Sequence, residues 1–239
     1  MDPYRFLLFD LDNTLLDFNA AEGEALKELF KEYNIPFTRK VQHAYNTVNK
    51  SLWQDYEKGN ISRDVVLNTR FSLLFESFGY KVDGSKLESS YRNYLTNSHQ
   101  LIKGSIELMD YLVQTYHCYA LTNGVAHTQH RRLRDSSLLP YFQGIFVSEE
   151  MGFQKPMKEF FDNAFSHIPN FSADKALMIG DSLSSDIQGG INAGVDTCWF
   201  NPKKKVNQTG PLPTYEVSSL DQLYALLSPN KINQKTYKS

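Results

Sequence analysis

A run of four apolar residues near the start of the chain, Phe6–Phe9, leads directly into two aspartates, Asp10 and Asp12. A short apolar run is typical of a strand buried on both faces of a parallel sheet, although periodicity alone also fits a buried helix. As a strand it would place both carboxylates at its C-terminal end, on one face, where open α/β sheets form their binding crevice. Neighbouring carboxylates repel each other unless a cation or a shared proton intervenes, so the pair predicts a metal ion.

The composition argues against several classes of protein. The 239 residues carry 25 Lys and Arg against 27 Asp and Glu, so no basic surface suggests a nucleic-acid polymer or a membrane as partner. No secretory signal or transmembrane run is visible, and Cys118 and Cys198 lie far apart without metal or redox spacing. We expect a reduced, soluble, cytoplasmic protein, for which a monomer and a dimer both stay open.

Helical spacing dominates between the first strand and about residue 98. Apolar stripes with a period near 3.6 predict four helices, and no strand pattern interrupts them. Residues 16–98 are therefore predicted to form an all-helical module, with its own small core, inserted after the first strand. The stripes include Phe18, Ala21, Ala25 and Leu29; Val41, Tyr45 and Val48; Leu67, Phe71 and Leu74; and Leu87, Tyr91 and Leu95.

Strand and helix patterns alternate over the rest of the chain. Such alternation predicts a parallel sheet joined by right-handed crossovers. Residues 1–15 and 99–239 should therefore form one Rossmann-like α/β core, with helices on both faces of the sheet. The later strands are expected at 117–121, 144–147, 176–179 and 196–200, with a short edge strand at 215–217.

Several polar residues lie at the C-terminal ends of predicted strands or in the segments just beyond them. They are Asp10, Asp12, Thr122, Asn123, Lys155, Asp181 and Asp186. Because the C-terminal ends of parallel strands meet at one edge of a sheet, we expect these residues to converge. Oxygen donors without a His/Cys cluster favour Mg²⁺ over zinc. A lysine and a hydroxyl beside the metal suit a dianion, so the set predicts phosphoryl transfer.

Four short motifs contain these residues. They are Asp10-Leu11-Asp12-Asn13-Thr14, Thr122-Asn123-Gly124, Lys155-Pro156 and Gly180-Asp181-Ser182-Leu183-Ser184-Ser185-Asp186. Each alone could be a strand-ending turn, a helix cap or a surface lysine, but in this order they resemble the four motifs of haloacid dehalogenase-like phosphohydrolases. The helical insertion resembles the first type of cap domain in that family. Residues 185–194 and 197–201 resemble, more narrowly, the pyrimidine 5′-nucleotidase subgroup.

The resemblance implies a catalytic role for residues of the first three motifs. Asp10 would be the nucleophile that forms an aspartyl-phosphate, and Asp12 would be the general acid and base. Thr122, with the amide of Asn123 beside it, would bind the phosphoryl oxygens. Lys155 would neutralise the developing charge and hold Asp10 ionised.

The resemblance also implies the metal ligands. Mg²⁺ would bind to Asp10, to the main-chain carbonyl of Asp12 and to Asp181. Asp186 would support these ligands from behind or act on Lys155.

The implied function is a Mg²⁺-dependent phosphomonoester hydrolase. Its substrate would be a small phosphorylated metabolite, a nucleoside 5′-monophosphate, chosen by the helical cap. The alternative is a phosphosugar or phosphoglycolate phosphatase of the same family, which would share the catalytic residues. A phospho-accepting module like the response-regulator receivers also combines acidic residues, Mg²⁺, Thr and Lys, but it predicts a shorter chain without the insertion and leaves Asp12 without a task.

Overall fold

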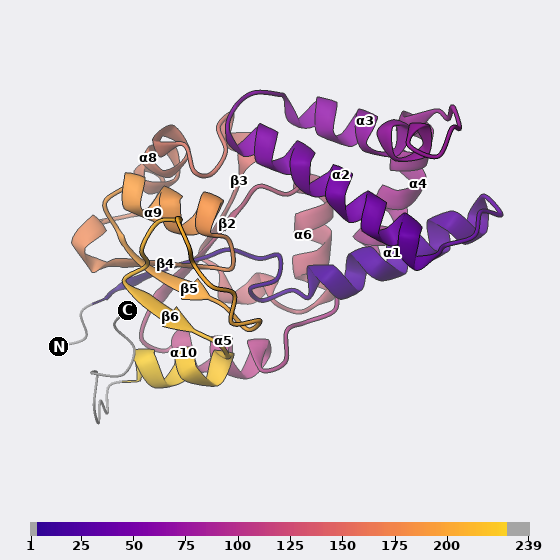
Figure 1. Cartoon of the computed structure of the whole chain (residues 1–239). Helices are drawn as coiled ribbons and strands as arrows, with labels where there is room; N and C mark the ends of the chain where they lie inside the picture. Colours follow the sequence, from indigo (N-terminus) through magenta and orange to yellow (C-terminus); the bar gives the residue numbers. More distant parts are fainter. Residues whose placement is uncertain (1–3, 229–239) are drawn as a thin grey trace. The chain divides into compact units, whose positions relative to one another are not determined.

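The computed structural model describes residues 4–228 of the chain (Figure 1). The chain divides into two compact units, Met1–Phe18 with His99–Ser239, and Asn19–Ser98. We call them the sheet unit and the helical unit. Among the described residues, no helix combines the length and the apolar character that crossing a membrane requires.

The sheet unit is built on a parallel sheet, as the sequence predicts. Within residues 4–228 it has six strands in the order β3-β2-β1-β4-β5-β6. The first strand is central: Phe6 pairs with His117 on one side and with Ala176 on the other. The strands are β1 (Phe6–Phe9), β2 (His117–Thr122), β3 (Gly144–Val147), β4 (Ala176–Gly180), β5 (Asp196–Phe200) and β6 (Tyr215–Val217).

Helices cover both faces of this sheet, and each face has its own core. Leu7 and Phe9 pack with residues of α5, α6 and α10, whereas Phe6 and Leu8 pack with residues of α8. The alternation follows from the strand pleat, and it explains why β1 is apolar at every position and fully buried. The helices of this unit are α5 (Ser105–Leu112), α6 (Ala126–Asp135), α7 (Ser148–Met151), α8 (Lys158–Ser166), α9 (Gln188–Asn192) and α10 (Leu220–Leu227).

The segment after β4 begins with an irregular turn. Instead of one continuous α-helix, a π-helical turn over Leu183–Ile187 precedes α9. The main-chain N–H of Ser182 donates to Asp186 Oδ2 at 3.0 Å, and Ser182 Oγ accepts from the N–H of Ser185 at 3.2 Å. These bonds tie the turn to the strand end, and π turns are often found at functional sites.

The helical unit contains four helices and no strand in residues 19–98. Thr38, Ser62 and Asp83 cap the last three by accepting main-chain N–H groups of the first turn. Aromatic side chains fill the core, with the rings of Phe30 and Phe75 stacked at 5.7 Å. The helices are α1 (Phe18–Glu32), α2 (Arg39–Glu57), α3 (Arg63–Glu76) and α4 (Gly84–Thr96).

Charged side chains are also buried inside the helical unit. Arg70, which is 1% exposed, donates to Glu88 Oε2 from Nε at 2.7 Å and from Nη2 at 2.5 Å. Its Nη1 donates to the Tyr45 hydroxyl at 3.2 Å and to Asn49 Oδ1 at 3.1 Å. Arg92 donates to the other oxygen of Glu88 at 2.6 Å. The apolar periodicity of the sequence gives no indication of this network.

Glu22 extends the network from α1. Its Oε1 accepts from Tyr45 Oη at 3.2 Å, Asn49 Nδ2 at 3.1 Å and Tyr91 Oη at 3.4 Å. The guanidinium of Arg70 lies 4.5 Å from the centre of the Tyr91 ring, where a cation–π contact adds to the ion pair. Every helix of this unit therefore contributes to one polar network.

Candidate active site

Lys155 lies at the centre of the residues that converge at the strand ends. Its buried ammonium group donates to Asp10 Oδ1 at 2.8 Å, to Asp186 Oδ1 at 2.7 Å and to the carbonyl of Leu121 at 2.7 Å. An ammonium has three protons, so all of its donors are used. Burial alone would lower the pKa of Lys155, but the carboxylates of Asp10 and Asp186 outweigh it and raise the pKa above its usual value. The lysine is therefore held in its charged form.

Asn123 fixes the main chain of Lys155. Asn123 Nδ2 donates to the Lys155 carbonyl at 3.0 Å, and the Lys155 N–H donates to Asn123 Oδ1 at 2.9 Å. These two bonds tie the end of β2 to the loop between α7 and α8. The lysine side chain consequently reaches Asp10 from a fixed starting point.

Asp10 directly follows β1 and is buried. Lys155 donates to one carboxylate oxygen, and Thr14 Oγ1 donates to the other at 3.1 Å. Burial raises the pKa of Asp10 well above its ordinary value; Lys155 lowers it, and the neighbouring acidic groups raise it further. The positive charge of Lys155 therefore offsets only part of the effect that burial and the neighbouring carboxylates have on the pKa of Asp10.

Three carboxylates meet beside Lys155. Asp10, Asp181 and Asp186 each place an oxygen within 4.8 Å of the other two. Both oxygens of Asp186 accept hydrogen bonds, from Lys155 and from the N–H of Ser182, whereas none from residues 4–228 reaches the carboxylate of Asp181. Burial and then the charge of Asp186 raise the pKa of Asp181 to about 7. Three carboxylates around one lysine leave an excess of negative charge, and an all-oxygen donor set fits a hard cation such as Mg²⁺.

Thr122 is the last residue of β2, and its side chain is buried. Its hydroxyl oxygen accepts from the N–H of Gly124 at 3.1 Å and from Gln129 Nε2 at 2.8 Å. A hydroxyl has two acceptor positions and one proton. Both acceptor positions are taken, and within the described part of the chain the proton is donated to no group. Thr122 is thus set to donate to an oxygen of a ligand.

Asp12 directs its carboxylate to α6 rather than to the three clustered carboxylates. Arg132 Nη1 donates to its Oδ1 at 2.5 Å, and Gln129 Nε2 donates to its Oδ2 at 3.0 Å. Arg132 and Gln129 are buried, and neither was predicted as a site residue, because residues 126–135 show only a polar, Arg-rich pattern in the sequence. The two residues are three positions apart and therefore lie on the same face of a helix. This spacing is the sequence feature that could have indicated that they act together.

Two glycines of the motifs leave room for site side chains. A Cβ at Gly180 would overlap the carboxylate of Asp186, and a Cβ at Gly124 would lie 2.7 Å from the side chain of Gln129. Real side chains do not approach so closely, so a residue larger than glycine would displace its neighbour. The motif glycines are therefore explained by close packing.

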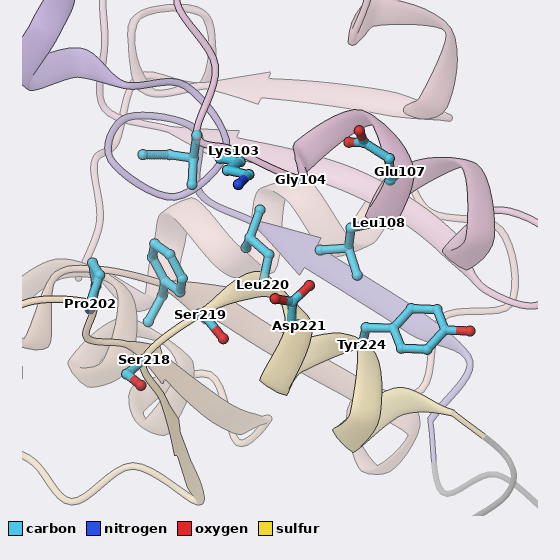
Figure 2. Close-up of a pocket in the computed structure, with 12 residues that line it drawn as sticks. Lys103, Gly104, Glu107, Leu108, Pro202, Ser218, Ser219, Leu220, Asp221 and Tyr224 are labelled. Atoms are coloured by element: carbon cyan, nitrogen blue, oxygen red, sulfur yellow. The ribbon is translucent and has the colours of Figure 1, made fainter.

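The sheet unit also contains a hollow that none of the candidate site residues lines (Figure 2). Its volume is about 550 Å³, and its lining comes mainly from the N-terminal ends of α5 and α10. Lys103 and the acidic residues Glu107 and Asp221 lie around it (Figure 2). None of the residues predicted for catalysis lines it, so the candidate active site remains at the strand ends.

Known proteins resemble this chain over nearly its whole length. A family model described as haloacid dehalogenase-like hydrolase matches residues 7–200. The pyrimidine 5′-nucleotidase PynA of Streptococcus pneumoniae is 46% identical, with 98% of this chain and 99% of PynA aligned. The pyrimidine 5′-nucleotidase YjjG of Escherichia coli is 35% identical over 94% of this chain and 98% of its own. The crystal structure of HAD-hydrolase YfnB from Bacillus subtilis, bound to magnesium, is 53% identical with a TM-score of 0.90, covering 94% of this chain and 98% of YfnB.

Proposed function

The chain belongs to the haloacid dehalogenase-like hydrolase family, and from this we propose that it is a Mg²⁺-dependent phosphomonoester hydrolase acting on pyrimidine nucleoside 5′-monophosphates. One observation carries the proposal: the buried Lys155 ammonium is held against Asp10. A carboxylate nucleophile beside a fixed positive charge is what phosphoryl transfer requires. The relatives named pyrimidine 5′-nucleotidases support the choice of substrate class.

In the first step Asp10 is the nucleophile. One of its carboxylate oxygens forms a bond to phosphorus while the bond from phosphorus to the leaving oxygen breaks, and an aspartyl-phosphate results. Asp12 gives its proton to the leaving oxygen, which departs as the nucleoside 5′-hydroxyl. Lys155 offsets the negative charge on the phosphoryl oxygens, and the Thr122 hydroxyl donates to one of them.

In the second step water hydrolyses the aspartyl-phosphate. Asp12, now a carboxylate, takes a proton from the water as the water oxygen attacks phosphorus. Phosphate leaves and Asp10 is regenerated. The side chain of Asn123 is bound to the Lys155 main chain, so a contact from Asn123 to the phosphoryl group falls to its main-chain N–H.

Three groups of this chain would hold the metal: Asp10, the main-chain carbonyl of Asp12 and Asp181. When bound, Mg²⁺ supplies the positive charge that keeps the carboxylates ionised next to a phosphate dianion. Trp199 Nε1 donates to the Asp181 carbonyl at 3.0 Å and so fixes the main chain at this ligand. Asp186 accepts from the Lys155 ammonium at 2.7 Å and so helps to hold it next to Asp10.

Residues 16–98 are proposed to be a cap that selects the nucleoside, inserted into a catalytic core of residues 1–15 and 99–239. Two observations support this division: the insertion directly follows the Asp10–Asp12 stretch, and the helical unit has its own core. The YfnB crystal structure reveals interdomain movement, which supports closure of such a cap over substrate. The buried free thiols of Cys118 and Cys198 support a reducing, cytoplasmic location.

A substrate panel tests the proposal. Values of kcat/KM with Mg²⁺ would be compared for UMP, dUMP, dTMP, purine nucleotides, sugar phosphates and phosphoglycolate. We expect the pyrimidine nucleotides to lead, and Asp10→Asn to abolish hydrolysis of every substrate, p-nitrophenyl phosphate included, without changing the circular dichroism spectrum. Wild-type activity of Asp10→Asn would overturn the nucleophile. Sugar phosphates or phosphoglycolate as the best substrates would overturn the nucleotide assignment and leave the hydrolase standing.

A further inference from the structure

Gln129 and Arg132 form a fixed cradle around the carboxylate of Asp12. Besides their bonds to Asp12, Arg132 Nη1 donates to Gln129 Oε1 at 3.1 Å, which links the two side chains to each other. The Arg132 side chain is 0% exposed, whereas that of Asp12 is 26% exposed. The arginine thus approaches from the protein interior, while part of Asp12 stays open to a ligand.

Gln129 and Arg132 both belong to α6, which begins close to the C-terminal end of β2. The first turn of α6 follows Thr122 by a few residues, and the N–H of Ala126 donates to Glu149 Oε2 at 2.8 Å. Gln129 Nε2 also donates to Thr122 Oγ1. One glutamine amide therefore bridges the proposed phosphate-binding hydroxyl and the proposed acid–base carboxylate.

The guanidinium also has a packed neighbour in the same unit. Its central carbon lies 5.6 Å from the centre of the Phe18 ring. A planar group held by hydrogen bonds and by contact with a ring keeps one orientation. The carboxyl group of Asp12 is consequently held at both of its oxygens.

We propose that Arg132 and Gln129 are positioning residues that orient Asp12 for proton transfer to the leaving oxygen; this rests on the proposed function. Donation of the proton leaves a negative charge on Asp12, and the guanidinium 2.5 Å away stabilises that charge as it forms. Gln129 sets the rotation of the carboxylate so that its open side faces the ligand.

This role predicts a dependence on the leaving group. Departure of a nucleoside alkoxide requires a proton, whereas p-nitrophenolate leaves without one, because it is a far weaker base. The ratio kcat/KM covers the steps through formation of the aspartyl-phosphate and omits its hydrolysis. We therefore expect Arg132→Met to lower kcat/KM about 100-fold for UMP, or for the best alkyl phosphate of the panel, and less than about 3-fold for p-nitrophenyl phosphate.

Matched variants separate positioning from folding. Arg131→Met, on the same helix but exposed and paired with Asp135 at 3.4 Å, should leave both rates unchanged. Arg132→Lys keeps the charge without the planar fork, so it should show the same selectivity with a smaller loss, and it serves if Arg132→Met does not fold. Gln129→Met should lower kcat/KM for both substrates, because Thr122 loses a hydrogen-bond partner, and it should lower kcat/KM further for the alkyl phosphate, because Asp12 loses one too.

A double-mutant cycle completes the test. If Arg132 acts through Asp12, Arg132→Met should cost little more once Asp12→Asn is present. Equal losses on both substrates, or a full 100-fold loss added to Asp12→Asn, would overturn the positioning role. Inactivity of the wild-type protein toward every phosphomonoester would instead overturn the proposed function.

Discussion

The two units each bury a basic side chain among carboxylates, but only one of the two networks is balanced in charge. In the sheet unit, one positive charge on Lys155 meets three carboxylates, Asp10, Asp181 and Asp186. The pKa of Asp10 is raised well above its ordinary value, and that of Asp181 is raised to about 7, in both cases first by burial. The negative charge at the strand ends therefore exceeds what the neighbouring side chains neutralise.

In the helical unit the charges match. Arg70 and Arg92 share Glu88, and Glu22 accepts from neutral donors of the same network. A buried ion pair with its hydrogen bonds satisfied calls for no further ligand. The comparison teaches that burial of charge alone does not mark a site. A site is indicated instead by an excess of buried charge that neighbouring side chains do not neutralise, located at the C-terminal ends of strands.

Replacing the lysine should have the largest effect. Lys155→Met removes the only positive charge in contact with Asp10 among residues 4–228, so the transition-state charge loses its partner. We expect kcat/KM to fall about 1000-fold for p-nitrophenyl phosphate and for nucleotides alike. Steady-state kinetics with saturating Mg²⁺ measure it. A loss below 10-fold would show that Lys155 is structural.

The matched change in the helical unit is Arg70→Met. Within residues 4–228 it leaves the buried Glu88 with Arg92 as its one charged partner, which should cost about 3 kcal/mol in the free energy of unfolding. The kcat/KM of the folded protein should stay within about 3-fold of wild type. Urea unfolding and kinetics on the same samples measure both. A 1000-fold loss of activity without destabilisation would remove the distinction between the two networks.

The fold could be predicted from the sequence because its signals are local. The run Phe6–Phe9 and the later strands are visible in the sequence as short stretches of apolar residues. The C-terminal ends of parallel strands lie at one edge of the sheet, whatever the length of the segments that connect them. The π-helical turn over Leu183–Ile187 could not be predicted, because its geometry goes with hydrogen bonds of Asp186 and Ser182 and not with a pattern of apolar residues.

The contacts of the site could be predicted only in part. Asp10 and Thr122 lie at strand ends as expected, because Asp10 directly follows β1 and Thr122 ends β2. Lys155 reaches the same edge from the loop between α7 and α8, where it donates to Asp10 and to the carbonyl of Leu121. The roles of Gln129 and Arg132 as partners of Asp12 could not be predicted. Their contact with Asp12 depends on the rotation of α6 about its axis, which the sequence of a polar helix does not indicate. The catalytic roles of all these residues remain predictions.

The excess charge also predicts a response to metal. A carboxyl group whose pKa is raised in the folded state stabilises the fold fully below its unfolded pKa, and this stabilisation is lost as pH rises through the folded pKa. For Asp181 the window runs from about 4 to about 7, so the metal-free protein should lose stability across it. Asp10, also raised, acts with the same sign.

Mg²⁺ favours the ionised carboxylates and should reverse this loss. At 100 times its Kd it should add about 2.7 kcal/mol, or roughly 5–10 °C in Tm, and the gain should be larger at pH 8 than at pH 5. Differential scanning fluorimetry in EDTA and in Mg²⁺ measures it. Asp181→Asn, the control, should remove most of the gain. An equal gain in that variant would place the metal elsewhere.

The smallest effects should come from substituting two glycines, one in each unit, at which an added Cβ would lie too close to neighbouring atoms. A Cβ at Gly180 would overlap the Asp186 carboxylate, so Gly180→Ala should displace Asp186 from Lys155 and lower kcat/KM about 10-fold. A Cβ at Gly84, the first residue of α4, would lie 2.8 Å from the carbonyl oxygen of Asn68 in α3, so Gly84→Ala should force these helices apart and cost about 1–3 kcal/mol of stability. Kinetics and urea unfolding of both variants separate the outcomes. If Gly180→Ala lost only stability, or Gly84→Ala lost only activity, the assignment of chemistry to the unbalanced network and of structure to the balanced one would be wrong.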